Sequence, residues 1–175
     1  SPWDLTAADL LALTLLSVEA PPYSVRRLLE PSSDRDRVLE LLSEQALPHD
    51  AHLATASTEV LEAMAALHET LRGCLSPAHV KTKNPWVTAS KLCSRKRPNL
   101  FPVRDGVVCA FLGLGRNYEV DWQVFRHIMQ DVDIRHQIDD LVDQAVARGA
   151  DIGDSSCRLR HLDVLLWMHA RTLPR

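Results

Sequence analysis

The sequence predicts an all-α protein, a compact bundle of about eight helices. Apolar residues recur at helical spacing, proline, glycine and serine residues separate these segments, and no segment alternates apolar and polar residues for long enough to make a strand. The 175 residues are 46% hydrophobic and 25% charged, as is usual for a globular domain. We expect one domain over residues 1–175, with two helical halves, 1–75 and 76–175, flanking a cleft as the alternative.

Polar caps and prolines mark the expected helices of the first half. Thr6 and Asp9 have the spacing of a capping box, and the leucines that follow predict a helix that is buried on most faces. Residues 48–56 are less periodic and are expected to form a loop. The expected helices run from Thr6 to Pro21, from Val25 to Pro31, from Ser32 or Ser33 to Leu42, and from Ser57 or Thr58 to about Gly73.

The sequence of the second half, residues 76–175, predicts five further helices. The first of them has a basic exposed side, and Asp105 caps the second. On the last helix, Arg158, Arg160, Asp163 and His169 could line one side of a cleft. The expected helices are Thr88 to Arg97, Val107 to Leu112, Asp121 to Val132, Ile134 to Arg148 and Ser155 to Arg171.

Composition and motifs exclude several classes of protein. No run of 18 apolar residues occurs, so we expect no membrane partner. The four cysteines form no CxxC pair and fit no zinc template, and Gly113 and Gly115 lack the third glycine of a dinucleotide-binding loop. We therefore expect no metal and no cofactor, and reduced thiols in a cytoplasmic protein.

The basic residues are segregated along the sequence. Residues 71–104 contain no Asp or Glu but hold eight of the twenty Lys and Arg residues, so this segment carries +8 and the rest of the chain −11. A segregated basic segment is the usual electrostatic footprint of a protein that binds a polyanion. The alternative is a basic surface that pairs with the acidic remainder of the protein.

Asp105 is the candidate catalytic residue. It follows Pro102 and Val103 and precedes two valines, and a carboxylate at a helix start in apolar surroundings is well placed beside a cationic transition state. The alternative is that Asp105 only caps the helix, which is the commonest role of Asp before such an apolar run.

The order of elements around Asp105 supports the first interpretation. A turn is followed by a helix that opens with Thr88-Ala89, then by Pro102-Val103, Asp105 and Val108. This order resembles the core of the helix-hairpin-helix DNA glycosylases, although Lys83, Asn84 and Pro85 stand where that family has its hairpin glycines. The whole chain also resembles an uncharacterised bacterial all-helical family with the pattern Ala-Ser-Lys-Leu, Lys-Arg-Pro, Pro-Val and Asp, here at residues 89–92, 96–98, 102–103 and 105.

The resemblance implies a DNA-binding protein that acts as a monofunctional base-excising glycosylase, because Val87 stands where bifunctional members have a Schiff-base lysine. The alternative is that Lys91, one turn along the same face, takes the place of that lysine. Asp105 would stabilise the sugar cation or activate water. The residues expected to bind nucleic acid are Lys81, Lys83, Trp86, Thr88, Lys91, Arg95, Lys96 and Arg97. The alternative is a non-catalytic helical domain that binds nucleic acid or another protein.

Overall fold

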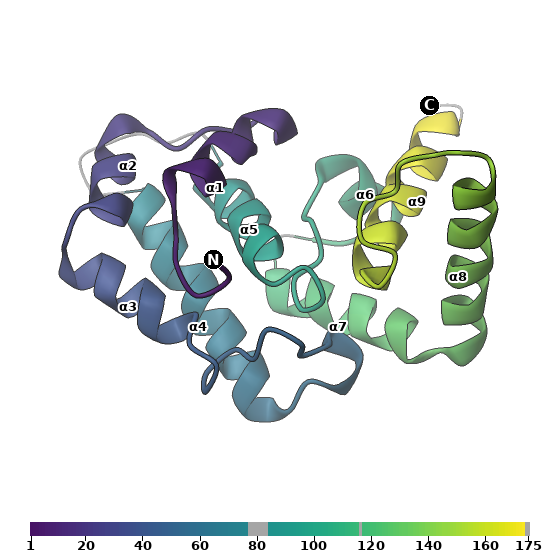
Figure 1. The fold of residues 1–175 in the computed structure, drawn as a ribbon, viewed down its shortest axis with the longest axis horizontal. Helices are drawn as coiled ribbons and strands as arrows, with labels where there is room; N and C mark the ends of the chain where they lie inside the picture. Colours follow the sequence, from purple (N-terminus) through teal and green to yellow (C-terminus); the bar gives the residue numbers. More distant parts are fainter. Residues whose placement is uncertain (77–83, 116, 174–175) are drawn as a thin grey trace. The chain divides into compact units, whose positions relative to one another are not determined.

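The protein is all-α, as predicted. The structure is a computed structural model that describes residues 1–76, 84–115 and 117–173, and within these ranges it contains helices and no strand (Figure 1). The helices are α1 (Ala7–Ala12), η1 (Leu13–Leu16), α2 (Pro22–Leu29), α3 (Ser33–Leu41), η2 (Leu53–Thr55), α4 (Thr58–Leu75), α5 (Pro85–Lys96), α6 (Gly106–Phe111), α7 (Tyr118–Gln130), α8 (Val132–Ala147) and α9 (Arg158–Thr172), of which η1 and η2 are 3-10 helices.

The chain forms two compact units. The first comprises Ser1–Ala51 and Ala56–Arg97, and the second comprises His52–Thr55 and Pro98–Arg175. Helices α1 to α5 therefore belong to the first unit, and η2 and α6 to α9 belong to the second (Figure 1). The first unit extends beyond residue 75, the limit of the predicted halves, because α5 packs along α4.

The predicted helix starts are confirmed at four polar caps. The backbone N–H and the hydroxyl of Thr6 each donate to Asp9 Oδ2 at 3.0 Å, which makes the expected capping box. Ser32 and Ser57 each accept a hydrogen bond from the backbone N–H three residues later, and Asp105 caps α6. These side chains satisfy N–H groups that have no partner inside their helix.

Three expectations about the helices are wrong. The helix expected from Thr88 begins at Pro85, because proline is accepted in the first turn, where no intrahelical partner needs its N–H. The expected loop of residues 48–56 contains the short helix η2. The first expected helix is not buried on most of its faces: Leu11 of α1 and Leu15 of η1 are 68% and 85% exposed.

The second unit has its own apolar core. Helix α7 packs against η2 and α8, and α9 packs against α6 and α8. The buried rings of Phe101 and Trp122 lie edge to face with centroids 5.4 Å apart. A buried ion pair between Arg104 and Asp121 lies beside this core. Across the described part of the chain, no helix combines the length and the apolar character needed to span a bilayer.

Arg97, directly after α5, is the largest fully buried side chain of the first unit. It is 1% exposed and has no carboxylate partner among the hydrogen bonds of its guanidinium group. Instead, Nε donates to Leu47 O at 2.8 Å, Nη2 donates to Leu42 O at 2.5 Å, and Nη1 donates to the carbonyls of Pro2 and Lys96 at 2.7 and 2.9 Å. Leu42 is the C-terminal cap of α3, where the helix dipole favours a cation.

Arg97 also lies over the indole ring of Trp3, 4.8 Å from the ring centroid. One side chain therefore ties the N-terminal segment, the end of α3 and the loop before η2 to the end of α5. Burial lowers the pKa of this guanidinium group, but an arginine stays charged at neutral pH. The carbonyl oxygens around it compensate for the water that it has lost.

We predict that Arg97→Ala strongly destabilises the first unit. The variant leaves buried carbonyls without donors, at about 1–3 kcal/mol each, so the free energy of unfolding should fall by about 3 kcal/mol or more. Urea denaturation followed by circular dichroism measures this loss. The control is Arg37→Ala, which removes an exposed pair with Glu40 and should cost less than about 1 kcal/mol. If the free energy of unfolding falls by the same small amount in Arg97→Ala and Arg37→Ala, Arg97 does not anchor the first unit.

Candidate functional site

Asp105 lies at the start of α6 as its N-terminal cap. Its Oδ1 accepts a hydrogen bond from the Val107 N–H at 2.8 Å, and the residue is half-buried. This is the structural role that the local sequence allowed. The catalytic role that the glycosylase resemblance implies stays a prediction.

A second carboxyl group, that of Asp163 on α9, lies near Asp105. Asp163 is 5% exposed, and its Oδ2 accepts a hydrogen bond from the Val103 N–H at 2.7 Å. Burial raises the pKa of Asp163 to about 8, and the negative charge of Asp105 acts in the same direction, against the hydrogen bond from Val103 and the charge of Arg160. Asp163 is therefore mostly protonated at neutral pH and supports the fold, rather than lining an open cleft as the sequence suggested.

The basic side of α5 is largely inside the first unit, so the expectation of an exposed basic helix is wrong. Lys91 Nζ donates to Leu16 O at 2.7 Å, and Lys96 Nζ donates to Ser1 O at 2.7 Å and to Asp9 Oδ2 at 3.0 Å. Both lysines are buried, as is Arg97. These three cations satisfy internal oxygen atoms and cannot contact a phosphate in this structure.

The other predicted nucleic-acid-binding residues are placed as follows. Thr88 is buried, and Trp86 is half-buried, with its carbonyl 3.3 Å from Nε2 of the buried His68. Arg95 is exposed and forms an ion pair with Asp9 at 2.9 Å. Lys81 and Lys83 lie outside the described residues.

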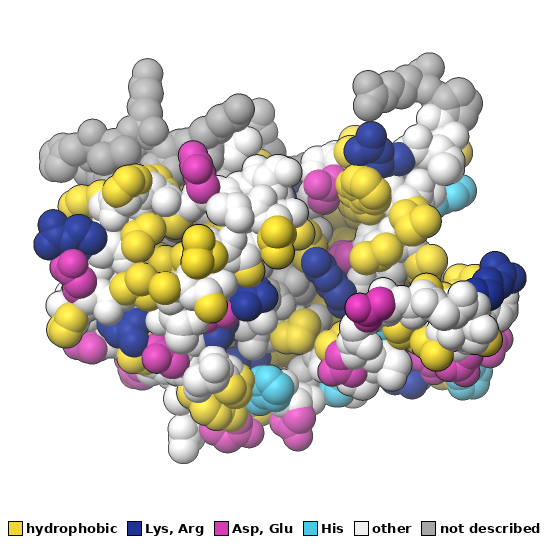
Figure 2. All heavy atoms as spheres, turned by 45° about the horizontal axis from the view of Figure 1, so that its top comes forward, with side chains coloured by type: hydrophobic (Ala, Val, Ile, Leu, Met, Phe, Trp, Pro, Cys, Tyr) yellow, Lys and Arg dark blue, Asp and Glu magenta, His cyan; other side chains and the backbone are white. Residues whose placement is uncertain are grey.

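The carboxylate of Asp9 pairs with two cations of α5, Arg95 and Lys96. Burial alone would raise its pKa, but hydrogen bonds from the Thr6 N–H and from Lys96 lower the pKa below its usual value. The segregated charge of residues 71–104 is thus partly compensated inside the protein, as the alternative interpretation of that segment proposed. Figure 2 agrees for the face that it displays, where Lys and Arg side chains occur singly among acidic and hydrophobic ones.

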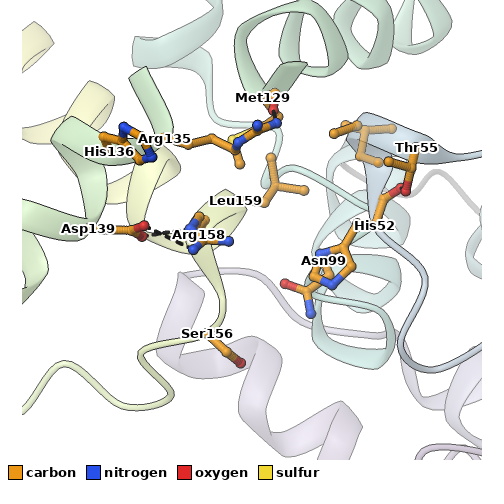
Figure 3. A pocket seen from close by; sticks show the side chains of 12 residues that line it. His52, Thr55, Asn99, Met129, Arg135, His136, Asp139, Ser156, Arg158 and Leu159 are labelled. Carbon is orange, nitrogen blue, oxygen red and sulfur yellow. Dashed lines mark hydrogen bonds and ion pairs between the residues drawn. The ribbon is translucent and has the colours of Figure 1, made fainter. Parts of the chain in front are cut away.

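The second unit contains a cavity of about 410 Å³ that the sequence did not indicate (Figure 3). Five segments line it: the end of α7, one face of α8, the start of α9, the segment around η2, and the turn at Asn99. Its polar lining side chains are His52, Thr55, Asn99, Arg135, His136, Asp139, Ser156 and Arg158, and its apolar lining residues are Leu53, Ala54, Met129 and Leu159. Asp105 does not line it.

Two arginines and one carboxylate set the charge of this cavity. Arg158 forms a two-pronged ion pair with Asp139, with Nε and Nη2 at 2.6 and 2.9 Å from the two carboxylate oxygens. Arg135 Nη1 donates to Met129 O at 2.9 Å. The hydrogen bond from Arg158, with the nearby charges of His136 and Arg135, lowers the pKa of Asp139. The cavity thus carries one excess positive charge when both of its histidines are neutral.

Helix α9 begins at the edge of the cavity. Ser156 and Arg158 flank its N-terminal cap, Cys157, and both line the cavity. The N-terminal end of a helix carries a partial positive charge and backbone N–H groups that favour anions. This end of α9 adds to the positive potential of Arg135 and Arg158.

Asn99 brings to the cavity a side-chain hydrogen-bond acceptor, Oδ1, that no described residue donates to. Its backbone carbonyl accepts a hydrogen bond from the Leu53 N–H at 2.9 Å, which joins the turn after α5 to η2. Its side-chain Oδ1 is buried and has no hydrogen-bond partner among the described residues. A buried acceptor of this kind costs free energy until a ligand or water donates to it.

Sequence reasoning named Arg158 as a possible cleft residue but missed the rest of the cavity. His52 lies in the segment 48–56 that was expected to form a loop, and the sequence gives no signal for Arg135, His136 or Asn99. No motif could have found them, because they come from segments far apart in the chain. Within the described ranges, no group of three or more His, Cys, Asp or Glu side chains is arranged to hold a metal ion.

We predict that Asp163 makes the stability of the protein depend on pH. The folded protein holds the Asp163 proton up to about pH 8, whereas the unfolded chain releases it near the ordinary value of 3.8. The free energy of unfolding should therefore fall as the pH rises between these values. Asp163→Asn retains an oxygen for Val103 but does not titrate, so its stability should depend less on pH. Urea denaturation of both proteins from pH 4 to 8 tests this, and identical pH profiles would contradict it.

Comparison with known proteins identifies a family but no activity. No curated protein and no solved structure matches the chain. A family described as a family of unknown function, DUF6308, matches residues 1–170. The match covers both units and nearly the whole sequence. The chain therefore belongs to the DUF6308 family.

Proposed function

We propose that the second unit binds a small phosphate-bearing ligand in the cavity between η2, α8 and α9. The observation that carries this proposal is the convergence of two guanidinium groups and two imidazole rings on one cavity with a single carboxylate. A volume of about 410 Å³ lies within the range of about 300–1,000 Å³ that is typical of small-molecule sites.

Phosphate fits this lining better than a neutral ligand does. Arginine presents several N–H donors in a planar fork that matches the oxygens of a phosphate group. Among the described residues, Arg135 has one hydrogen bond, from Nη1 to Met129 O, which leaves other donors of its guanidinium group for a ligand. Asp139 fixes Arg158 through two hydrogen bonds and so keeps this second cation in place.

This proposal is closer to the non-catalytic alternative than to base excision. DNA binding and glycosylase activity stay predictions, since they depend on Asp105 and on residues that lie mostly inside the first unit. Base release from lesion-bearing duplex by the wild type, lost in Asp105→Asn, would support them.

A cytoplasmic location is also proposed, because all four cysteines are free thiols, which suits a reducing compartment.

We predict that the protein binds pyrophosphate and that Arg135→Ala weakens this binding at least about tenfold. A hydrogen bond to a charged group contributes about 1.5–3 kcal/mol, and 1.4 kcal/mol corresponds to a factor of ten in Kd. Isothermal titration calorimetry at low salt measures both proteins.

The matched control for this titration is Arg37→Ala, since Arg37 is an exposed arginine of the first unit that pairs with Glu40. Its affinity for pyrophosphate should equal that of the wild type. An equal loss of pyrophosphate affinity in the two variants would overturn the proposed function, and so would the absence of binding of every phosphate-bearing ligand by the wild type.

A further inference from the structure

The cavity has two chemically different sides. In Figure 3 the ion pair of Asp139 with Arg158 lies on one side, together with His136, and His52, Thr55 and Asn99 lie on the opposite side. Arg135 extends from α8 to the end of α7, where it donates to Met129 O. One side is therefore cationic, and the other is uncharged apart from the imidazole of His52 and offers hydrogen bonds.

The uncharged side is built to accept a hydrogen bond from a ligand. Asn99 Oδ1 is buried without a donor among the residues that the structure describes. The hydrogen bond from the Leu53 N–H to Asn99 O holds the backbone of Asn99, so the carboxamide group is carried on a fixed segment. A simple anion such as phosphate has no N–H group to offer to this oxygen.

Apolar residues also line the cavity. Leu53, Met129 and Leu159 are buried core residues. An apolar lining that also carries a hydrogen-bond acceptor suits a flat heterocycle whose edge donates an N–H group. Asparagine is the side chain that most often pairs with adenine through its carboxamide.

We infer that the ligand is a nucleotide, with its phosphate at the side of Arg135 and Arg158 and its base at the side of Asn99. This inference rests on the proposed function and adds the second half of the ligand. The same chemistry is present in a free mononucleotide and in one nucleotide of a single strand. The experiment below separates these two sources.

The test compares three ligands on the wild-type protein by isothermal titration calorimetry: AMP, ribose 5-phosphate and inorganic phosphate. AMP should bind about tenfold more tightly than ribose 5-phosphate, since only AMP carries a base whose amino group can donate to Asn99 Oδ1 while its phosphate is held by the arginines. If ribose 5-phosphate binds as tightly as AMP, the nucleotide inference is wrong while phosphate binding stands. If none of the three ligands, pyrophosphate or the oligonucleotide below binds, both proposals fail.

Two variants locate the two halves of the ligand. Asn99→Leu should reduce the affinity for AMP to that of ribose 5-phosphate and leave ribose 5-phosphate binding unchanged, whereas Arg135→Ala should weaken the binding of both. Asn117→Ala is the control, because this asparagine caps α7 and does not line the cavity. Equal AMP affinity in Asn99→Leu and the wild type would contradict the assignment of the base side.

A single-stranded adenine-containing oligonucleotide distinguishes the source of the nucleotide. If AMP competes with the oligonucleotide, and if Asn99→Leu and Arg135→Ala both weaken oligonucleotide binding, the cavity accepts one nucleotide of a strand. Oligonucleotide binding without AMP binding supports a strand as the source only if Asn99→Leu and Arg135→Ala both weaken it. If neither variant weakens it, the strand binds elsewhere and the inference is overturned.

Discussion

The hydrogen bonding of buried cations to internal oxygen atoms is the constraint on which the first unit depends. Lys91, Lys96 and Arg97 leave water, and each must find acceptors inside the protein, because an uncompensated buried charge is very costly. They find backbone carbonyls and one carboxylate, that of Asp9. Asp9 and Arg97 therefore fix where the N-terminal segment, α1 and the end of α3 lie within this unit.

Because of these internal contacts, several cations of the basic segment, residues 71–104, bind atoms of the protein and not an external polyanion. In the sequence, eight positive charges without a negative neighbour indicate a surface for a polyanion. In the folded protein, Arg95 and Lys96 share Asp9, and Arg104 pairs with Asp121. The cations that we propose to face a ligand are two others, Arg135 and Arg158. Both lie outside residues 71–104, in the part of the sequence whose net charge is negative, so the charge distribution along the sequence does not indicate a cationic site there.

The parts of the fold that depend on local interactions could be predicted from the sequence. The caps at Thr6, Ser32 and Ser57 satisfy N–H groups within three residues, so the cap and its partner can be identified together. Asp105 was likewise predicted as a cap. The burial of Lys96 could not be predicted in this way, because its partners Ser1 and Asp9 are more than 80 residues away in the chain. The cavity has the same origin in long-range packing, since its lining joins residues near 52, 99, 135 and 158.

The arginine Nε–H signals in a ¹H–¹⁵N spectrum report, in one experiment, both the buried cations of the first unit and the cations of the cavity. On titration with AMP, the signals of Arg135 and Arg158 should shift, while that of Arg97, enclosed by carbonyls, should stay in place. A shift of the Arg95 and Arg97 signals, with those of Arg135 and Arg158 unchanged, would place the anion at the C-terminal end of α5 and contradict binding in the cavity.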